Sequence, residues 1–284
     1  MPSPRFRALP ILLPILAPFA FADGRIVVVT DEWPLTTGRA FNAPNDAAVF
    51  VTNVADWFTG GETGRFLAYS THASLSHAQI RGAMEAAGHE WVVNAAADTS
   101  LANLLTFNGV FVVGRAIDTT AFSNYLNAGG NVYIAAGAGG AGGAANEAAW
   151  YNPILEPRGL QLAAPYSVGG LDVPISGSSP LLAGVDHLYA FGANQLSDLT
   201  PSDPRSTIIF SHSALKIAVY DDQCSLDGDV NCDCAVDLTD LSTLLQNFGS
   251  IGGMTRAQGD LNGDANVDLI DLAALLANFG STCG

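Results

Sequence analysis

The feature that most constrains this chain is a short acidic pattern near its C-terminus, which occurs twice, 31 residues apart. The residues at positions 1, 3, 5, 7, 9 and 12 of each copy are Asp229, Asn231, Asp233, Ala235, Asp237 and Asp240, then Asp260, Asn262, Asp264, Asn266, Asp268 and Asp271. Calcium takes roughly six to eight oxygen ligands, and this spacing supplies side-chain oxygens, a carbonyl at position 7 and a closing carboxylate. The pattern predicts two bound Ca²⁺ ions.

An amphipathic helix is expected after each loop, because apolar residues recur with helical spacing. They are Leu241, Leu244, Leu245 and Phe248 in the first copy, and Leu272, Leu275, Leu276 and Phe279 in the second. Gly249 and Gly280 follow, where a left-handed helix C-cap is expected. Each copy is therefore one calcium loop and one helix, without the entering helix of a full EF-hand.

The stretches DVNCDCAVDLTDLSTLLQNFG and DLNGDANVDLIDLAALLANFG together resemble the type I dockerin module, over about residues 222–284. The resemblance implies a small all-α calcium-binding module that docks on a cohesin-like or other extracellular protein. In dockerins the residues just after the ninth loop position contact the partner, and here they are Leu238, Thr239, Leu269 and Ile270. The alternative is that the leucines fill the module's own core.

Position 6 of such loops is normally glycine, but this chain has Cys234 and Ala265 there. A left-handed conformation costs a residue with a Cβ atom about 1–2 kcal/mol. Weakened calcium affinity is therefore expected.

The N-terminus has the pattern of a secretory signal peptide over residues 1–22. Arg5 and Arg7 precede an apolar run that ends in the small-x-small site at residues 20–22. The run is short and interrupted by prolines, which disfavours a membrane anchor. We expect a secreted, extracellular or cell-surface protein with no membrane span after cleavage.

The cysteine positions Cys224, Cys232, Cys234 and Cys283 all fall in the C-terminal module. Disulfides are expected in an exported protein, and three pairings are possible for four cysteines. A clasp involving Cys283 is favoured, because a Cys232–Cys234 bridge would strain a calcium loop. A zinc site is disfavoured because the usual C-x₂-C spacing is missing.

Residues 23–221 form the second predicted region, an α/β domain. Composition is 49% hydrophobic and 13% charged, which is enough to bury a core. The net charge is −16 with a single lysine, which excludes a basic surface for nucleic acid. Predicted strands lie at 25–30, 65–71, 90–94, 109–114 and 131–137, with helices at 46–58, 76–87, 119–127 and 146–155. Short strand-like pieces follow at 160–164 and 207–220. This alternation predicts a parallel sheet.

The element order, with YLNAGGNVYIAAGAGG as the stretch carrying most of the likeness, resembles the class I glutamine amidotransferase-like fold, a flavodoxin-like sheet shared with ThuA-like proteins. That family places a cysteine on the turn after this strand and a His-x-Glu later. Residues 135–143 contain no Cys, Ser or Thr, and Ala214 stands where the glutamate would be. The amidase nucleophile and relay are therefore missing, which predicts a catalytically silent domain.

Several polar residues are expected at the carboxyl ends of the strands, where open parallel sheets bind ligands. Asp31 and Glu32 are candidate general bases, and Arg115 is a candidate clamp for an anionic or sugar ligand. His72 and Asp118 fall at the same edge, and the alternative is that all five are ordinary loop residues. Glycines at 137, 139 and 142 satisfy G-x-G-x-x-G, but a tightly packed turn is the favoured interpretation.

Two functions follow. The first is a secreted binding or assembly protein, attached by its calcium module within a polysaccharide-degrading complex. The second is a carbohydrate-active hydrolase tethered by its dockerin.

Overall fold

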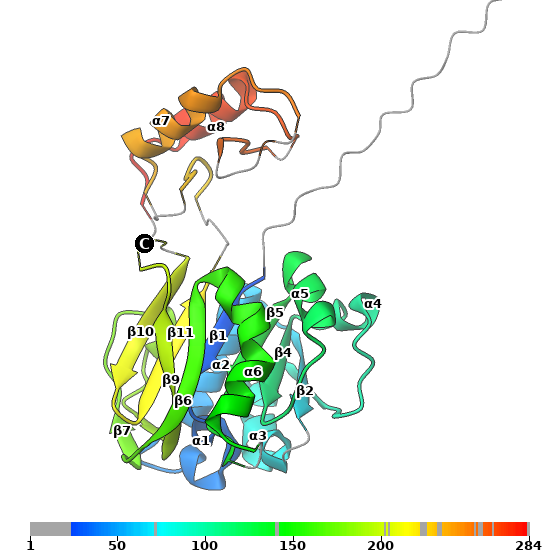
Figure 1. Cartoon of the computed structure of the whole chain (residues 1–284), viewed down its shortest axis with the longest axis vertical. Coiled ribbons are helices and arrows are strands. Elements are labelled where there is room, and N and C mark those ends of the chain that lie inside the picture. The colour runs from blue at the N-terminus through cyan, green and yellow to red at the C-terminus, as the bar shows by residue number, and fades with distance from the viewer. Residues whose placement is uncertain are drawn as a thin grey trace, which may run out of the picture. The chain divides into compact units, whose positions relative to one another are not determined.

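The structure, a computed structural model, describes residues 24–70, 73–139, 142–201, 203, 205–221, 226–231, 235–252, 254, 258–262 and 264–282. Its described residues divide into two compact units, an α/β unit up to residue 221 and a C-terminal unit from residue 226 onward (Figure 1). Each unit is described by itself.

The α/β unit is built on one seven-stranded, mostly parallel sheet with the order β10-β11-β1-β5-β4-β2-β3. The parallel strands are β1 (Ile26–Val29), β2 (Arg65–Ser70), β3 (Glu90–Val93), β4 (Gly109–Val113) and β5 (Asn131–Ala135). The antiparallel strands are β10 (Ser206–His212) and β11 (Leu215–Tyr220). The α/β class is thus confirmed, while the hairpin beside β1 departs from the all-parallel sheet that was expected.

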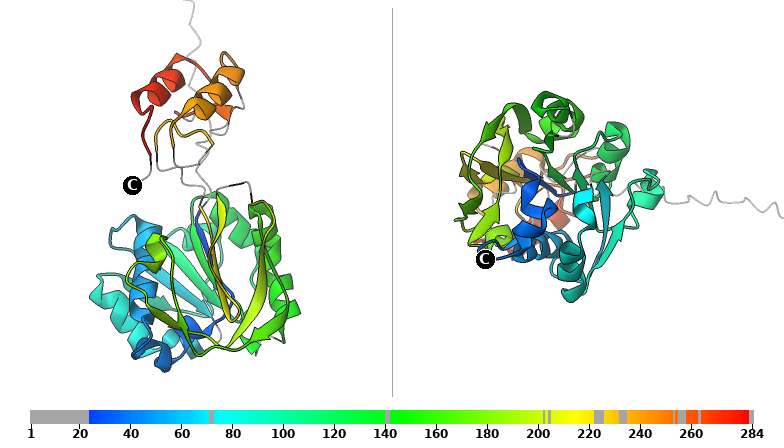
Figure 2. Two further views of the ribbon diagram at one scale, coloured as in Figure 1. Left: turned by 90° about the vertical axis from the view of Figure 1, so that its left-hand side faces the viewer. Right: turned by 90° about the horizontal axis from the view of Figure 1, so that it is seen from below.

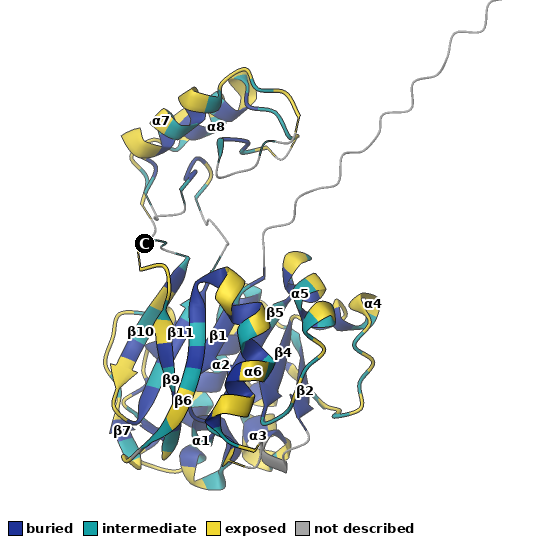
Figure 3. Cartoon of the chain, in the orientation of Figure 1, coloured by how far each residue is buried: buried dark blue, intermediate teal, exposed yellow. Residues whose placement is uncertain are grey.

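Helices cover both faces of the sheet (Figure 2). One face carries α1 (Trp33–Thr36), α2 (Ala47–Thr59) and α3 (Ala78–Ala86), and the other carries α4 (Leu101–Leu104), α5 (Thr119–Asn127) and α6 (Ala144–Leu155). Alternate residues of each strand face opposite sides, so Val27 and Val29 join one core while Ile26 and Val28 join the other. Figure 3 shows the result, with buried strands between helices whose outer faces are exposed.

Two small antiparallel ribbons complete the unit. They are β6 (Leu160–Val168) with β9 (Gly192–Asp198), and β7 (Asp172–Pro174) with β8 (His187–Tyr189). Short 3₁₀ turns are η1 (Gly38–Phe41), η2 (Ala73–Ser76), η4 (Glu156–Arg158) and η5 (Pro180–Leu182). Only the start of β6 was expected, because β9 has the polar sequence GANQLSD.

The connections diverge at the carboxyl ends of β1 and β5. These strands are neighbours in the sheet, but the chain leaves β1 toward α1 and α2 and leaves β5 toward α6 on the opposite face. Divergent connections of this kind open a ligand-binding position in α/β sheets. Asp31 and Glu32 follow β1 at this point.

The C-terminal unit contains two helices, α7 (Leu238–Asn247) and α8 (Leu269–Ala277), at the positions predicted from the leucine spacing. Each begins with a capping box in which Asp237 or Asp268 is the N-cap. Gly249 and Gly280 take positive φ angles of 84° and 87°, as expected of C-cap glycines. Val230, Val236, Leu244, Val267 and Leu275 form a small buried core.

The two copies pack on each other reciprocally. Val236 pairs with the chain after α8, through Gly280 N and Ser281 O, while Val267 pairs in the same way with Gly249 N and Ser250 O. Gly228 packs on α8 at Leu275, and Gly259 packs on α7 at Leu244. Because each of these contacts recurs 31 residues away in the sequence, the copies are related by an approximate two-fold arrangement.

Candidate functional site

The closing aspartates of the two loops make the same hydrogen bonds. Asp240 Oδ1 accepts from the backbone N–H groups of Val230 (2.7 Å) and Asn231 (3.1 Å), and its Oδ2 accepts from Asp237 N (2.8 Å). In the second copy, Asp271 accepts from Leu261, Asn262 and Asp268 at 2.9, 3.2 and 2.8 Å. Position 12 therefore closes each loop by tying its start to the first turn of the following helix.

The second loop is described almost completely. Asp260 at position 1 accepts from the N–H groups of Asp264 (3.2 Å) and Ala265 (2.8 Å). Asp264 in turn accepts from Asn266 N at 2.9 Å. Ala265 has φ +66°, so position 6 does adopt the left-handed conformation that the sequence predicted to be strained there.

The loops fit calcium in the kind of ligand they offer, since every side chain at positions 1, 3, 5, 9 and 12 is a hard oxygen donor. Across the residues that the structure describes, however, no three His, Cys, Asp or Glu side chains converge closely enough to hold a metal ion. Two calcium ions remain a prediction. Asp233, Cys234 and the cysteines 224, 232 and 283 lie outside the described residues, so the first loop's position 5 and the disulfides stay predictions as well.

The four residues predicted to contact a partner are all exposed. Leu238 is 72%, Leu269 71% and Ile270 61% accessible, and Thr239 is also exposed. The alternative that these leucines fill the core is wrong, because Leu244 and Leu275 occupy it. Leu238 lines a groove of about 440 Å³ on α7 together with Leu241, Ser242, Leu245 and Gln246.

In the α/β unit, Asp31 is fully buried, and both oxygens of its carboxylate accept hydrogen bonds from backbone N–H groups. Its Oδ1 accepts from Trp33 N (2.8 Å), and its Oδ2 accepts from Phe191 N (2.5 Å) and Gly192 N (2.6 Å). Burial raises the pKa of Asp31 to about 6, against the lowering effect of these N–H groups. Asp31 thus fastens the turn before β9 to the end of β1, which is a structural role.

Glu32 is the candidate general base whose pKa lies nearest neutrality. It is 6% exposed, and burial, followed by the charges of Asp31 and Glu147, raises its pKa to about 7. A carboxyl group of this kind exchanges a proton near neutral pH.

Glu147 on α6 is a buried acid at the same edge of the sheet that the sequence analysis missed. Its carboxylate accepts from Gly137 N (2.8 Å), Ala138 N (2.9 Å) and the Tyr166 hydroxyl (3.0 Å). Burial raises its pKa, with these three donors acting against the rise. The one usable indication in the sequence was a single acid within the apolar segment AANEAAW.

The turn after β5 is where the resembled family carries its nucleophile. Gly137 has φ +81°, and a Cβ atom there would lie 2.4 Å from the carbonyl oxygen of Gly192. Paired N–H groups on such a turn form an anion site. Here the Glu147 carboxylate fills that site from within the chain. The favoured interpretation of these glycines as a tightly packed turn agrees with this geometry at Gly137.

Arg115 and Asp118 are used within the fold. Arg115 donates to Ala95 O (2.7 Å) and Tyr69 OH (3.0 Å), and its guanidinium lies 3.6 Å from the Tyr69 ring centre. Asp118 caps α5 by accepting from the N–H groups of Thr120 and Ala121. His72 lies outside the described residues.

Comparisons with family models, with curated proteins and with solved structures find no match to this chain. A search of the described helices for a membrane span finds none of sufficient length and apolar character.

Proposed function

We propose that this protein is a secreted, calcium-binding dockerin-type protein, whose C-terminal unit attaches a catalytically silent α/β domain to an extracellular partner. The partner is a cohesin-like protein, and the setting is an assembly that degrades polysaccharide. The α/β domain is proposed to be of the flavodoxin-like, class I glutamine amidotransferase-like type. Read from the β3 edge, the parallel strands have the order 3-2-4-5-1. This order matches the flavodoxin order 2-1-3-4-5 after a circular renumbering in which β2 counts as the first strand and β1 as the fifth, and that likeness supports the proposal.

One observation carries the attachment proposal, namely the apolar residues that both copies leave exposed at equivalent positions. Leu238 and Leu269 begin their helices, and Leu245 and Leu276 lie seven residues further along, 52% and 53% accessible. Exposed apolar side chains grouped on one helix face are typical of a protein-binding surface. Their duplication gives the unit two similar faces.

Calcium would be held by the side chains of both loops, through positions 1, 3, 5 and 12 and a carbonyl at position 7, with Asp237 and Asp268 at position 9. Binding requires the loop acids to converge, so calcium is expected to order the unit and stabilise it. Calcium supplies the positive charge that offsets repulsion among these carboxylates.

The proposal of a silent domain rests on the turn after β5. Its N–H groups at Gly137 and Ala138 donate to Glu147, and residues 135–143 supply no nucleophile. Glutamine is therefore not expected to be hydrolysed by the pure protein, and a calcium-independent glutaminase activity would contradict this part of the proposal.

The docking test compares the double variant Leu238→Asp, Leu269→Asp with the control Val49→Asp, an exposed apolar residue on α2. The probe is an immobilised type I cohesin domain, with calcium and with chelator. We expect capture of the unaltered and control chains in calcium only, and no capture of the double variant. Equal capture of all three would contradict the proposed surface. Calcium-dependent melting of the double variant verifies that it is folded.

A second candidate, a polysaccharide hydrolase, is supported by Glu32, because its pKa near 7 suits an acid catalyst. Hydrolysis of a polysaccharide that disappears in Glu32→Gln, while calcium binding is kept, would favour this candidate over the silent domain.

A further inference from the structure

A groove in the α/β unit lies away from the carboxyl ends of the strands. Its volume is about 400 Å³, and it is lined by Arg25, Asn53, Asp56, Trp57, Gly60 and Pro180. Neither the docking proposal nor the Glu32 candidate uses any of these residues. The volume falls in the range that holds small organic ligands, roughly 300–1,000 Å³.

One side of the groove is a stripe along α2. Asn53, Asp56, Trp57 and Gly60 follow the spacing i, i+3, i+4, i+7, which places them on one face of the helix. The core-facing residues of α2 occupy the opposite face. The stripe therefore combines a carboxylate, an amide and an indole, and the indole also packs along the edge of the core.

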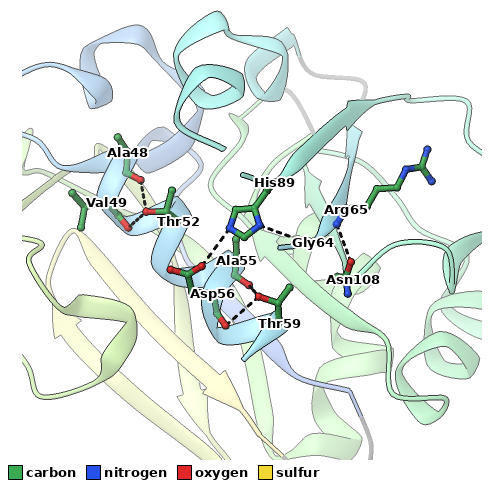
Figure 4. A network of polar contacts seen from close by, with 10 residues as sticks. All are labelled: Ala48, Val49, Thr52, Ala55, Asp56, Thr59, Gly64, Arg65, His89 and Asn108. Atoms are coloured by element: carbon green, nitrogen blue, oxygen red, sulfur yellow. Dashed lines mark hydrogen bonds and ion pairs between the residues drawn. The ribbon is translucent and has the colours of Figure 1, made fainter. Parts of the chain in front are cut away.

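Asp56 is the one charged residue of α2, and a buried histidine faces it (Figure 4). His89 Nδ1 accepts a hydrogen bond from Gly64 N (3.1 Å), which puts the imidazole proton on Nε2. Nε2 lies 3.3 Å from Asp56 Oδ1, and the Asp56 side chain is 54% exposed. The histidine thus faces one carboxylate oxygen at ion-pair distance without a hydrogen bond to it, and the carboxylate as a whole remains open to solvent.

The neighbouring hydroxyl groups on α2 do not compete for a ligand. Thr52 donates to Ala48 O, and Thr59 donates to Ala55 O, each at 3.0 Å (Figure 4). Asn53 Nδ2 donates to Leu181 O and Ala183 O, which holds η5 against the helix. The chief acceptor that α2 offers to the groove is therefore the carboxylate of Asp56, and its remaining donor is the indole N–H of Trp57.

Arg25, the residue directly before β1, holds the indole of Trp57 in place. The Arg25 guanidinium lies 4.9 Å from the Trp57 ring centre, donates to the Trp57 carbonyl and pairs with Asp221 at 3.0 Å. Trp57 is half-buried. An anchored aromatic ring beside a carboxylate acceptor suits a ligand that combines C–H surface with hydroxyl donors.

We propose that this groove binds a neutral saccharide, one or two sugar rings of a glycan chain. The ring's C–H face packs on Trp57, and its hydroxyl groups donate to Asp56. A neutral rather than an acidic sugar is favoured, because Asp56 repels a sugar carboxylate and the cation of the groove, Arg25, is already paired with Asp221. This site is separate from the calcium module, so the saccharide proposal can fail while the docking proposal holds, and the reverse.

The test is calorimetric titration of the full chain with hexasaccharides of β-1,4-linked glucose, xylose or mannose, and of α-1,4-linked galacturonic acid. At least one neutral chain is expected to bind, and the galacturonate chain more weakly. Asp56→Asn is expected to raise Kd about fivefold and Trp57→Ala about tenfold or more, since each removes one contact class. Glu62→Gln, an exposed acid just beyond α2, is the matched control and should leave Kd unchanged.

The binding should persist when calcium is chelated, which separates it from the proposed function. Thermal melting identifies any variant that fails to fold. If Trp57→Ala fails to fold, the test is decided by Asp56→Asn. Absence of binding by all three neutral chains at about 5 mM would overturn the proposal. So would binding that Asp56→Asn leaves unaltered.

Discussion

The two units differ in the pKa shifts of some of their acidic side chains. In the C-terminal loops, Asp237 and Asp264 are solvated, and backbone N–H groups, of Thr239 and Asn266 respectively, hold their pKa values below the usual range. At the edge of the sheet, burial raises the pKa values of Asp31, Glu32 and Glu147. The carboxyl groups of Asp237 and Asp264 therefore stay charged to a lower pH than usual, whereas those of Asp31, Glu32 and Glu147 keep their protons to a higher pH.

This difference shows that an acidic residue says little about function until its surroundings are known. Charged, solvated carboxylates at alternate positions suit a cation that brings its own compensating charge. Buried carboxylates that accept several N–H groups fasten loops and turns, at the cost of desolvation. Asp31 and Glu147 have this role at the sheet edge, and Asp240 and Asp271 have it at the ends of the predicted calcium loops. The predictions below separate these two roles, beginning with the largest expected effect.

Replacing Glu147 should be the most damaging change. Glu147→Ala removes the acceptor of two N–H groups and the Tyr166 hydroxyl and leaves a cavity, so we expect a loss of about 3–5 kcal/mol in unfolding free energy. Urea unfolding followed by tryptophan fluorescence measures it. Glu156→Ala serves as the exposed control on the next turn, and equal effects of the two changes would show that Glu147 is not a fastening residue.

Replacing a closing aspartate, Asp240 or Asp271, should reduce stability less than replacing Glu147 does. The loss should be equal in the two copies. Asp240→Ala and Asp271→Ala each remove the acceptor of three N–H groups at a loop end, an expected loss of about 2–3 kcal/mol for the C-terminal unit. Calcium-free circular dichroism melts measure the loss. Strongly unequal losses would contradict the approximate two-fold arrangement.

Glu32 should make the α/β unit less stable as the pH rises. Its folded pKa, about 7, exceeds that of an ordinary glutamate, so the native state binds the extra proton and the stabilisation present below about pH 4 is lost as pH rises through 7. Glu32→Gln should reduce the fall in unfolding free energy between pH 5 and 8 by roughly 2 kcal/mol. An unchanged pH profile would contradict the buried state assigned to Glu32.

The smallest effect concerns the left-handed residue of the second loop. Ala265→Gly removes the Cβ strain at φ +66° and should stabilise that loop by about 0.5–1 kcal/mol, with a modest rise in calcium affinity. The comparison is with Ala274→Gly inside α8, which should destabilise by about 1 kcal/mol. Equal losses of stability in Ala265→Gly and Ala274→Gly would mean that the surrounding residues already relieve the backbone strain at Ala265.

Much of the architecture followed from periodicity. The alternation of buried strands and helices predicted all five parallel strands, and α5 was predicted to the residue at 119–127. The duplicated loop pattern predicted α7, α8 and their capping glycines. These elements were predictable because local patterns specify them.

What escaped prediction depends on contacts between distant residues. The polar segment β9 forms a strand because β6 pairs with it and Asp31 holds the turn before it. Neither contact is visible in the sequence of β9. Glu147 is ten residues from the turn that it fills. Likewise, the pairing of His89 with Asp56 joins residues 33 positions apart, and nothing in the spacing of either marks it.

The central claim is that the duplicated loops bind calcium, and calorimetric titration of the full chain with Ca²⁺ tests it most directly. The account predicts two sites per chain and a calcium-dependent rise in the melting temperature of the C-terminal unit, both abolished in the double variant Asp240→Ala, Asp271→Ala. No heat of binding at roughly millimolar calcium, or binding that the double variant retains, would contradict it.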